Sequence, residues 1–425
     1  MTFNFKFLRG LQWGRGQRVK TGSRARRLLR GLRNLGLLVL ASWGTAHGAS
    51  CATPTTEFGV DPVEARRILD SIANLVVLPT LEATATAMGE LETATAAFAG
   101  SAVEDDRLAS QEAWRTAMRS WERVEVLQIG PTGPHTSPGG MDIRDEVYSW
   151  PLTNRCRIDQ ELVAESYTDP AAFAAELVNV RGLDTMEYLL FVDVPSNACS
   201  ELSPINADGT WAALGEDVVR ARRAAYAASV ATLVAEEATE LRAAWSPAGG
   251  AFADDLANAG LSSSTYATTQ QALDEVIRAM FYVDLLTKDV KLGQPLGMGA
   301  CATATCPGLV ESREAAASKE HIAQNLRAFQ QLYLGGPDAD AGAGFDELLV
   351  GVGEDVLAER MATNIEAAIA AVEAIDGSLQ TAVDADNLGV VDALAAVQLM
   401  TSDLKGPMVT ALSLRIPAEG AGDAD

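Results

Sequence analysis

The chain has 425 residues, of which 33 are basic and 57 acidic, and its formal net charge is −24. This length allows one large domain or two ordinary ones. A surface so acidic repels phosphate backbones, which argues against nucleic-acid binding, whereas it is compatible with the attraction of cations. The solvated surface of a secreted protein also accounts for most of these charges.

Residues 1–50 predict an export leader. They contain ten Lys or Arg residues and no acid, and a mostly apolar run over residues 35–46 leads to small residues before Cys51. This order of charged, apolar and small residues is typical of a secretory signal. The apolar run, about twelve residues, is too short for a lasting transmembrane helix. Without the ten basic residues of the leader, 23 basic residues remain against 57 acidic ones, a net charge of −34.

Two features of the leader leave alternatives open. Arg26-Arg27 resembles a twin-arginine export signal, but an Arg-rich leader also produces such pairs by chance. Cys51 is a candidate for the lipidated first residue of a lipoprotein, although residues 48–50 lack the large aliphatic residue usual three places before such a cysteine. The expected location is the periplasm or the outer membrane, with membrane attachment only through a lipid on Cys51.

Beyond the leader the sequence predicts helices nearly throughout, because it is rich in Ala, Leu and Glu and shows no sustained strand alternation. A first helix begins at Asp61-Pro62 and is expected to kink at Pro79. A second helix is expected over residues 105–128. One side of it carries, at spacings of 4, 3 and 4, Trp114, Met118, Trp121 and Glu125.

The remaining helices suggest two halves. Further helices are expected over residues 155–165, 169–178, 182–191 and 207–245, and the last covers 387–413 with a bend at Gly406-Pro407. Residues 246–250, Ser-Pro-Ala-Gly-Gly, are typical of a joint. We therefore expect an all-α fold of two helical-bundle domains joined in one elongated unit. The predicted boundaries are 51–246 and 250–415, with a flexible tail over 416–425.

Four cysteines besides Cys51 predict disulfide bonds, because export makes them possible. They fall as one pair in each half, Cys156 with Cys199 and Cys301 with Cys306. Four cysteines allow three connectivities, and the sequence favours this one without eliminating the others. A cysteine metal site is disfavoured because the chain has no Cys-x-x-Cys spacing.

The segment 181–191, Arg-Gly-Leu-Asp-Thr-Met-Glu-Tyr-Leu-Leu-Phe, places two acids on an apolar helix face. Asp184 and Glu187 are three residues apart, so their side chains share that face. A carboxylate in apolar surroundings is costly unless a cation, a metal ion or hydrogen-bond donors meet it. Together with Glu125, these two acids form a candidate metal site.

Five segments, taken in order, carry a resemblance to a known family. They are Trp114 through Trp121 with Glu125-Val-Leu-Gln-Ile-Gly-Pro131, Tyr148-Ser-Trp-Pro151 with Asp159, Gly182-Leu-Asp-Thr-Met-Glu187, Glu311-Ser312 with Ser318 and Asn325, and Leu404-Lys405 with Ala411-Leu412. Their order and spacing are similar to those of the imelysin family of exported bacterial proteins. The third segment lies where that family carries a Gly-x-His-x-x-Glu signature, and Asp184 stands in place of the histidine.

The resemblance implies an all-α fold of two bundle-like domains, a periplasmic or envelope location and an association with iron acquisition. It also implies a site near the domain interface, with the His and Glu of the signature as metal ligands. The family was first classed as metallopeptidases. In this chain the signature positions are Asp184 and Glu187.

Two interpretations of Glu125, Asp184 and Glu187 remain open. As metal ligands they offer only oxygen atoms, which favours iron, calcium or manganese over zinc. As a buried structural network they would pair with Arg157 or Arg181. The position of Asp184 at the start of its helix also suits a capping role.

A second polar set matches the family in the other half of the chain. It is expected to line a polar ligand-binding surface that faces the first domain, although helix capping explains its two serines equally well. His321, on a predicted helix, is expected to be a packed or surface residue. The members of this set are Glu311, Ser312, Ser318 and Asn325.

The predicted function is non-enzymatic binding of a metal ion or a metal-bearing ligand, iron first, with an envelope iron-uptake protein as a further partner. The chain has no His-Glu-x-x-His and no Gly-x-Ser-x-Gly motif, which disfavours hydrolysis. Two alternatives stay open. One is a metallopeptidase, and the other is an envelope scaffold that holds a partner protein after loss of the metal site.

Overall fold

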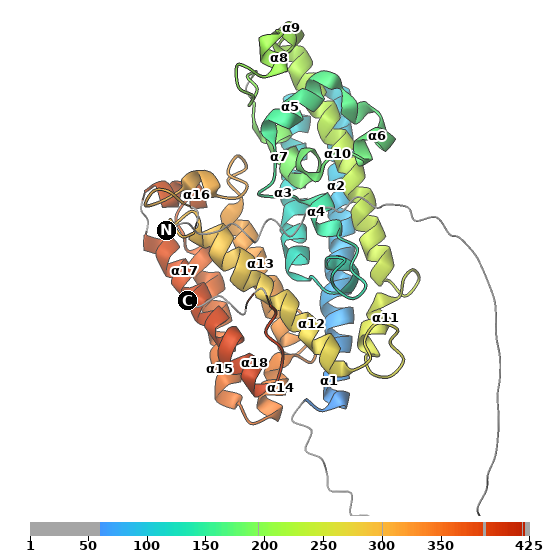
Figure 1. Cartoon of the computed structure of the whole chain (residues 1–425), viewed down its shortest axis with the longest axis vertical. Coiled ribbons are helices and arrows are strands. Elements are labelled where there is room, and N and C mark those ends of the chain that lie inside the picture. The colour runs from blue at the N-terminus through green and yellow to red at the C-terminus, as the bar shows by residue number, and fades with distance from the viewer. Residues whose placement is uncertain (1–59, 194, 300, 386–387, 419, 421–425) are drawn as a thin grey trace, which may run out of the picture. The chain divides into compact units, whose positions relative to one another are not determined.

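The computed structural model describes residues 60–418 and 420, apart from residues 194, 300, 386 and 387. The predicted leader and Cys51 lie outside the described residues, as does most of the predicted tail. Every regular element in the described part of the chain is a helix (Figure 1). The all-α prediction is confirmed.

The helices of the first half are α1 (Pro62–Ser71), α2 (Leu78–Ser101), α3 (Glu104–Val126), α4 (Ile143–Val147), α5 (Arg155–Ala164), α6 (Pro170–Ala174), α7 (Leu183–Phe191), α8 (Pro204–Ala207), α9 (Thr210–Leu214) and α10 (Glu216–Trp245). Those of the second half are α11 (Phe252–Ala257), α12 (Thr269–Tyr282), α13 (Ser318–Leu334), α14 (Phe345–Gly351), α15 (Asp355–Glu373), α16 (Leu379–Asp384), α17 (Leu388–Asp403) and α18 (Val409–Ala411). Instead of the single helix predicted over 207–245, α9 and α10 are separated by Gly215, whose φ of 74° interrupts the helix.

Two prolines coincide with π-helical turns. Pro79 follows the π-helical segment Ile72–Val77, and Pro407 lies inside another, Leu404–Met408. A proline has no N–H to donate, so the helix changes its hydrogen-bond spacing near it. The continuous helical run Pro62–Ser101 is apolar enough to cross a membrane by composition alone, but half of its most apolar stretch is buried inside the fold, as in a core helix.

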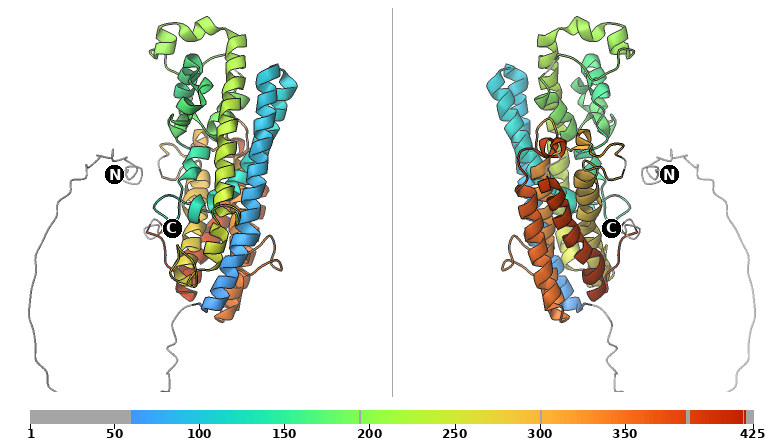
Figure 2. Two further views of the ribbon diagram at one scale, coloured as in Figure 1. Left: turned by 90° about the vertical axis from the view of Figure 1, so that its right-hand side faces the viewer. Right: turned by 90° about the vertical axis from the view of Figure 1, so that its left-hand side faces the viewer.

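Three long helices, α2, α3 and α10, form the frame that holds α7. Helix α2 contacts both α3 and α10, and α7 packs against α3 and α10; Figure 2 shows α2 and α10 running alongside each other. Trp114 and Trp121 of α3 are fully buried. The indole N–H of Trp114 donates to the carbonyl of Leu183 at 2.8 Å, which fixes the first turn of α7 on α3.

In the second half, α13, α15 and α17 pack in sequence, and a π-helical segment, Val283–Gly293, continues α12 and packs against α13 and α17. The two halves also contact each other, because α3 packs against α13 and α1 packs against α11 and α12. All described residues belong to one compact unit. The division into two domains therefore stays a prediction, and the seam between α3 and α13 is where their side chains meet.

The disulfide prediction is confirmed. Cys156 of α5 is bonded to Cys199, with their Cα atoms 4.5 Å apart. Cys301 is bonded to Cys306 across 5.9 Å and closes a short loop ahead of α13. The first bond ties α5 to the segment that follows α7, so it stabilises the region around the predicted acids.

Candidate functional site

Asp184 lies in the first turn of α7 and is held by hydroxyl groups. Its Oδ2 accepts hydrogen bonds from Ser149 Oγ at 2.7 Å and from Thr153 Oγ1 at 2.6 Å. Burial raises the pKa of Asp184, and the donors from Thr153 and Ser149 oppose that rise. Among the described residues no cation pairs with this carboxylate, so of the partners that the sequence allowed, hydrogen-bond donors meet it.

The two arginines predicted as partners are engaged elsewhere. Arg157 pairs with Glu161 of its own helix, and Arg181 pairs with Glu146 of α4. An arginine-paired network around Asp184 is therefore wrong.

Gly182 makes the entry into α7 possible. Its φ is 106°, and a Cβ there would lie 2.8 Å from the carbonyl oxygen of Val147 and 2.9 Å from Asp184 Oδ1. We expect Gly182→Ala to lower the free energy of unfolding by about 2 kcal/mol, since it adds backbone strain and a clash. Urea denaturation would measure this. Gly209→Ala is the matched control, because Gly209 also has a positive φ (70°) but open space around it; equal losses in both variants would contradict the role of the close contact.

Glu187, one turn further along α7, binds the main chain of the second half. Its Oε1 accepts hydrogen bonds from the backbone N–H groups of Glu314 at 2.9 Å and Ala315 at 3.0 Å. Burial raises the pKa of Glu187 to about 7, although these N–H groups and the charge of Arg155 oppose the rise. Glu187 thereby joins α7 to the turn that precedes α13.

Asp184 and Glu187 line a small polar pocket of about 160 Å³. Arg155 and Arg313 also line it, and both guanidinium groups bind Glu314. The two arginines balance the charges of the two carboxylates in the lining, so this pocket has no excess negative charge to attract a cation. Its lining residues are Trp150, Pro151, Thr153, Arg155, Asp184, Glu187, Gly308, Val310, Ser312 and Arg313.

Glu125 lies elsewhere, fully buried on α3. Its Oε1 lies 3.0 Å from the guanidinium of Arg144, and its Oε2 accepts from Lys291 Nζ at 3.0 Å and from the Tyr282 hydroxyl at 2.7 Å. Burial alone would raise the pKa of Glu125, but the charges of Lys291 and Arg144 lower it to about 2. The structure therefore brings Asp184 and Glu187 together in the pocket and places Glu125 in a separate ion-pair cluster.

A different set of side chains converges next to Glu125. One ligand atom each from Glu122, Glu311 and His321 lies within 4.8 Å of the other two. His321 Nδ1 is 3.2 Å from Glu122 Oε1 and 3.6 Å from Glu311 Oε2. We call these three residues the buried triad, because none is more than 1% exposed. Glu122 comes from α3, His321 from α13 and Glu311 from the turn before α13.

The facing atoms of the buried triad are unsatisfied. Glu122 Oε1, Glu311 Oε2 and His321 Nδ1 have no hydrogen-bond partner. Buried polar atoms are nearly always paired, so three such atoms pointing at one another call for a shared positive charge, which a proton on His321 or a metal ion would supply. Two carboxylates and an imidazole form a donor set that suits a divalent transition metal. On this observation the residues fit a metal ion.

Lys291 occupies the other side of these carboxylates. Its Nζ lies 2.5 Å from Glu122 Oε2 and 3.1 Å from Glu311 Oε1, in addition to its bond to Glu125. The three carboxylates thus face two full positive charges, those of Lys291 and Arg144. Burial and the nearby charge of Glu311 raise the pKa of Glu122 well above its usual value. One further positive charge, a proton or a metal ion, would balance the cluster.

The second predicted set partly joins this cluster. Asn325 Nδ2 donates to the backbone carbonyl of Glu122 at 2.6 Å and to its Oε2 at 2.9 Å. Ser318 Oγ is buried without a hydrogen-bond partner. Ser312 Oγ lies 3.4 Å from the hydroxyl of Tyr148, which donates to Glu311 Oε1 at 2.9 Å. Glu311 therefore belongs to the buried triad, Asn325 adjoins it, and Ser312 lines the pocket.

Sequence reasoning missed Glu122, Lys291 and the position of His321. Glu122 carried a usable signal, because it lies three residues before Glu125 and so shares its helix face. Lys291 lies in Val283–Gly293, where π-helical spacing departs from the 3.6-residue period. Its burial could not be read from that pattern.

The comparisons with known proteins agree with this architecture. The imelysin family model matches residues 77–403, more than half of the chain. The chain belongs to the imelysin family. No curated protein sequence matches it.

Two solved structures resemble this imelysin-family chain in fold. One, from Parabacteroides distasonis ATCC 8503, is provisionally named an iron-regulated protein A precursor; it has a TM-score of 0.65 and 19% identity, and the match covers 83% of this chain and 96% of that one. The other is an imelysin-like protein from Psychrobacter arcticum 273-4, with a TM-score of 0.63, 15% identity and coverage of 84% and 99%. At these identities the likeness concerns the fold alone.

Proposed function

We propose that this imelysin-family protein binds a metal ion, with iron as the expected metal, through Glu122, Glu311 and His321. The observation that carries the proposal is the convergence of three buried, unsatisfied ligand atoms. When bound, the metal would supply the positive charge that the surrounding carboxylates lack. In the predicted division of the chain, Glu122 belongs to the first domain and the other two ligands to the second, which corresponds to a site at the domain interface.

The choice of iron rests on chemistry and on relatives. An imidazole nitrogen among the ligands disfavours calcium, which prefers oxygen atoms only, and leaves iron, manganese and zinc as candidates. The imelysin resemblance implies an association with iron acquisition, and one similar structure bears the name of an iron-regulated protein.

We further propose a non-enzymatic role outside the cytoplasm. The buried triad is at most 1% exposed, so a peptide has no space beside it. Two disulfide bonds are compatible with an oxidising compartment. The provisional name of the Parabacteroides protein calls it a precursor. A periplasmic protein that holds iron for an envelope uptake system is consistent with these observations.

The test is metal binding by the purified protein, measured by titration calorimetry with Fe²⁺ under anaerobic conditions and repeated with Mn²⁺ and Ca²⁺. We expect Glu311→Gln and His321→Gln to weaken Fe²⁺ binding at least about tenfold, since each removes one ligand. Asp184→Asn is the matched control, because it removes a buried carboxylate from the pocket, and Asp184 accepts hydrogen bonds from Ser149 and Thr153 and not from the turn that carries Glu311. Binding that ignores both triad substitutions would refute the site, and loss in Asp184→Asn alone would move the metal to the pocket.

A further inference from the structure

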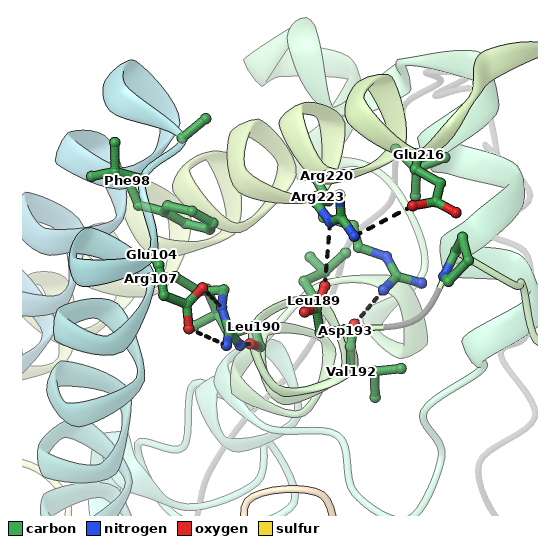
Figure 3. Close-up of a pocket in the computed structure, with 14 residues that line it drawn as sticks. Phe98, Glu104, Arg107, Leu189, Leu190, Val192, Asp193, Glu216, Arg220 and Arg223 are labelled. Carbon is green, nitrogen blue, oxygen red and sulfur yellow. Dashed lines mark hydrogen bonds and ion pairs between the residues drawn. The ribbon is translucent and has the colours of Figure 1, made fainter.

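A second cavity lies at the other end of α7. It has a volume of about 80 Å³ and is enclosed by the end of α2, the first turns of α3 and α10, and the last turn of α7 (Figure 3). Its walls are largely apolar, and three arginines reach it from α3 and α10. The apolar lining residues are Phe98, Val103, Leu189, Leu190, Val192 and Val219.

Two of the three arginines have acidic partners. Arg107 pairs with Glu104 at 2.6 Å, and it also donates to the carbonyl of Leu190 at 3.0 Å. Arg220 lies 3.5 Å from Glu216 and 3.4 Å from Asp193. These charges are balanced within the protein, so neither arginine needs a ligand.

The third arginine, Arg223, is buried without a carboxylate. Its side chain is part of the cavity wall and the residue is only 5% exposed. Its guanidinium donates to the main-chain carbonyls of Val192 and Ser196 and lies over the ring of Tyr188. Its Nε has no hydrogen-bond partner. No carboxylate lies within ion-pair distance of Arg223 in the part of the chain that the structure describes.

Arg223 therefore has no direct ion pair, although the charge of Asp159 acts on it through space and three acids, Glu104, Asp193 and Glu216, line the cavity beside its three arginines. A buried charge is costly unless an opposite charge meets it, and neutral carbonyls compensate a guanidinium only in part. An arginine presents several N–H groups in a planar arrangement that matches a carboxylate. What remains open is a direct anionic partner for the unpaired Nε of Arg223, beside an apolar wall.

We propose that this cavity binds a short-chain monocarboxylate, with the carboxylate on Arg223 and the alkyl chain against the apolar wall. The limited volume favours a chain of a few carbons. The site is separate from the buried triad and its occupancy does not depend on the metal.

The experiment is a calorimetric titration of the full protein with butyrate, together with a measurement of its melting temperature. The buffer contains little chloride, because chloride would compete for the charge of Arg223. Butyramide, which has nearly the same shape but no charge, is the second probe. We expect butyrate to bind and to raise the melting temperature, and butyramide to do neither. Equal binding of the two probes, or no binding of butyrate, would overturn the proposal.

Variants locate the binding. Arg223→Gln should weaken butyrate binding about tenfold or more, since it removes a charged hydrogen-bond donor. Arg222→Gln is the control, because Arg222 is its neighbour on α10 but binds Leu162 and Val163 outside the cavity. Should Arg223→Gln fail to fold, Val219→Phe fills the cavity and keeps the charge. Unchanged butyrate affinity in Val219→Phe would also overturn the proposal.

Discussion

Substitution of Lys291 by methionine is expected to destabilise the metal-free protein by about 3–5 kcal/mol, because it removes the cation from three buried carboxylates. Lys291 Nζ lies within 3.1 Å of oxygens of Glu122, Glu125 and Glu311, and all three glutamates are 0% exposed. Methionine has a similar length, so packing changes little. Urea denaturation of both proteins would measure the loss.

Lys319→Met supplies the control for Lys291→Met. The Lys319 ammonium group donates to the carbonyl of Ile375 at 2.7 Å and has no carboxylate partner among the described residues. We expect this variant to lose less than about 1 kcal/mol. Addition of Mn²⁺ should restore more stability to Lys291→Met than to the unsubstituted protein, because the cluster is then more negative. A loss below about 1 kcal/mol in Lys291→Met would show that the carboxylates are not held ionised by Lys291.

The helical architecture was largely predictable because its signals are local. The Trp114–Trp121 spacing identifies the buried face of α3, and both indoles are fully buried. Pro79 and Pro407 mark the two distorted places in their helices. The disulfide pairing followed from the position of each cysteine pair within one half. The helical inferences need only the near neighbours of a residue, whereas the pairing of Cys156 with Cys199, 43 residues apart, needed the division of the chain into two halves.

The partners of the acids could not be predicted, because they come from distant segments. The sequence indicated that Asp184 and Glu187 are buried and must be met by donors, and both are less than 10% exposed. The donors to Asp184 are hydroxyl groups more than 30 residues earlier, and those to Glu187 are backbone N–H groups more than 120 residues later. The residue type does not show that a backbone N–H will be the donor, so the sequence left a metal ion and an arginine as the two candidate partners.

The turn between residues 311 and 317 serves both the pocket and the buried triad. Glu311 points into the triad, while the N–H groups of Glu314 and Ala315 bind Glu187. Ser312 and Ala316 have positive φ values of 42° and 52°, so this turn is tightly folded. Glu187 binds the seven-residue turn that carries Glu311. A change at Glu187 in the pocket is therefore expected to displace Glu311 in the buried triad.

The pH dependence of stability is expected to change with Glu187→Gln. Burial raises the pKa of Glu187 from 4.5 to about 7 in the folded protein. Below pH 4.5 the carboxyl is protonated in both the folded and the unfolded states, so it does not change the free energy of unfolding with pH. As the pH rises to 7 the unfolded chain loses this proton first, so the free energy of unfolding falls by about 3 kcal/mol through this group. Glutamine does not titrate and avoids this loss.

The measured quantity for Glu187→Gln is the difference in unfolding free energy between the variant and the unsubstituted protein, obtained by urea denaturation at pH 4 and at pH 8. This difference should shift in favour of the variant by about 3 kcal/mol between the two pH values, because all other titrating groups are common to both proteins. Glu240→Gln, which removes an exposed carboxylate from α10, should show a shift below about 0.5 kcal/mol. A shift of the opposite sign for Glu187→Gln would mean that Glu187 is ionised in the fold well below pH 7. In that case the N–H groups of Glu314 and Ala315 and the charge of Arg155 would outweigh the effect of burial on Glu187.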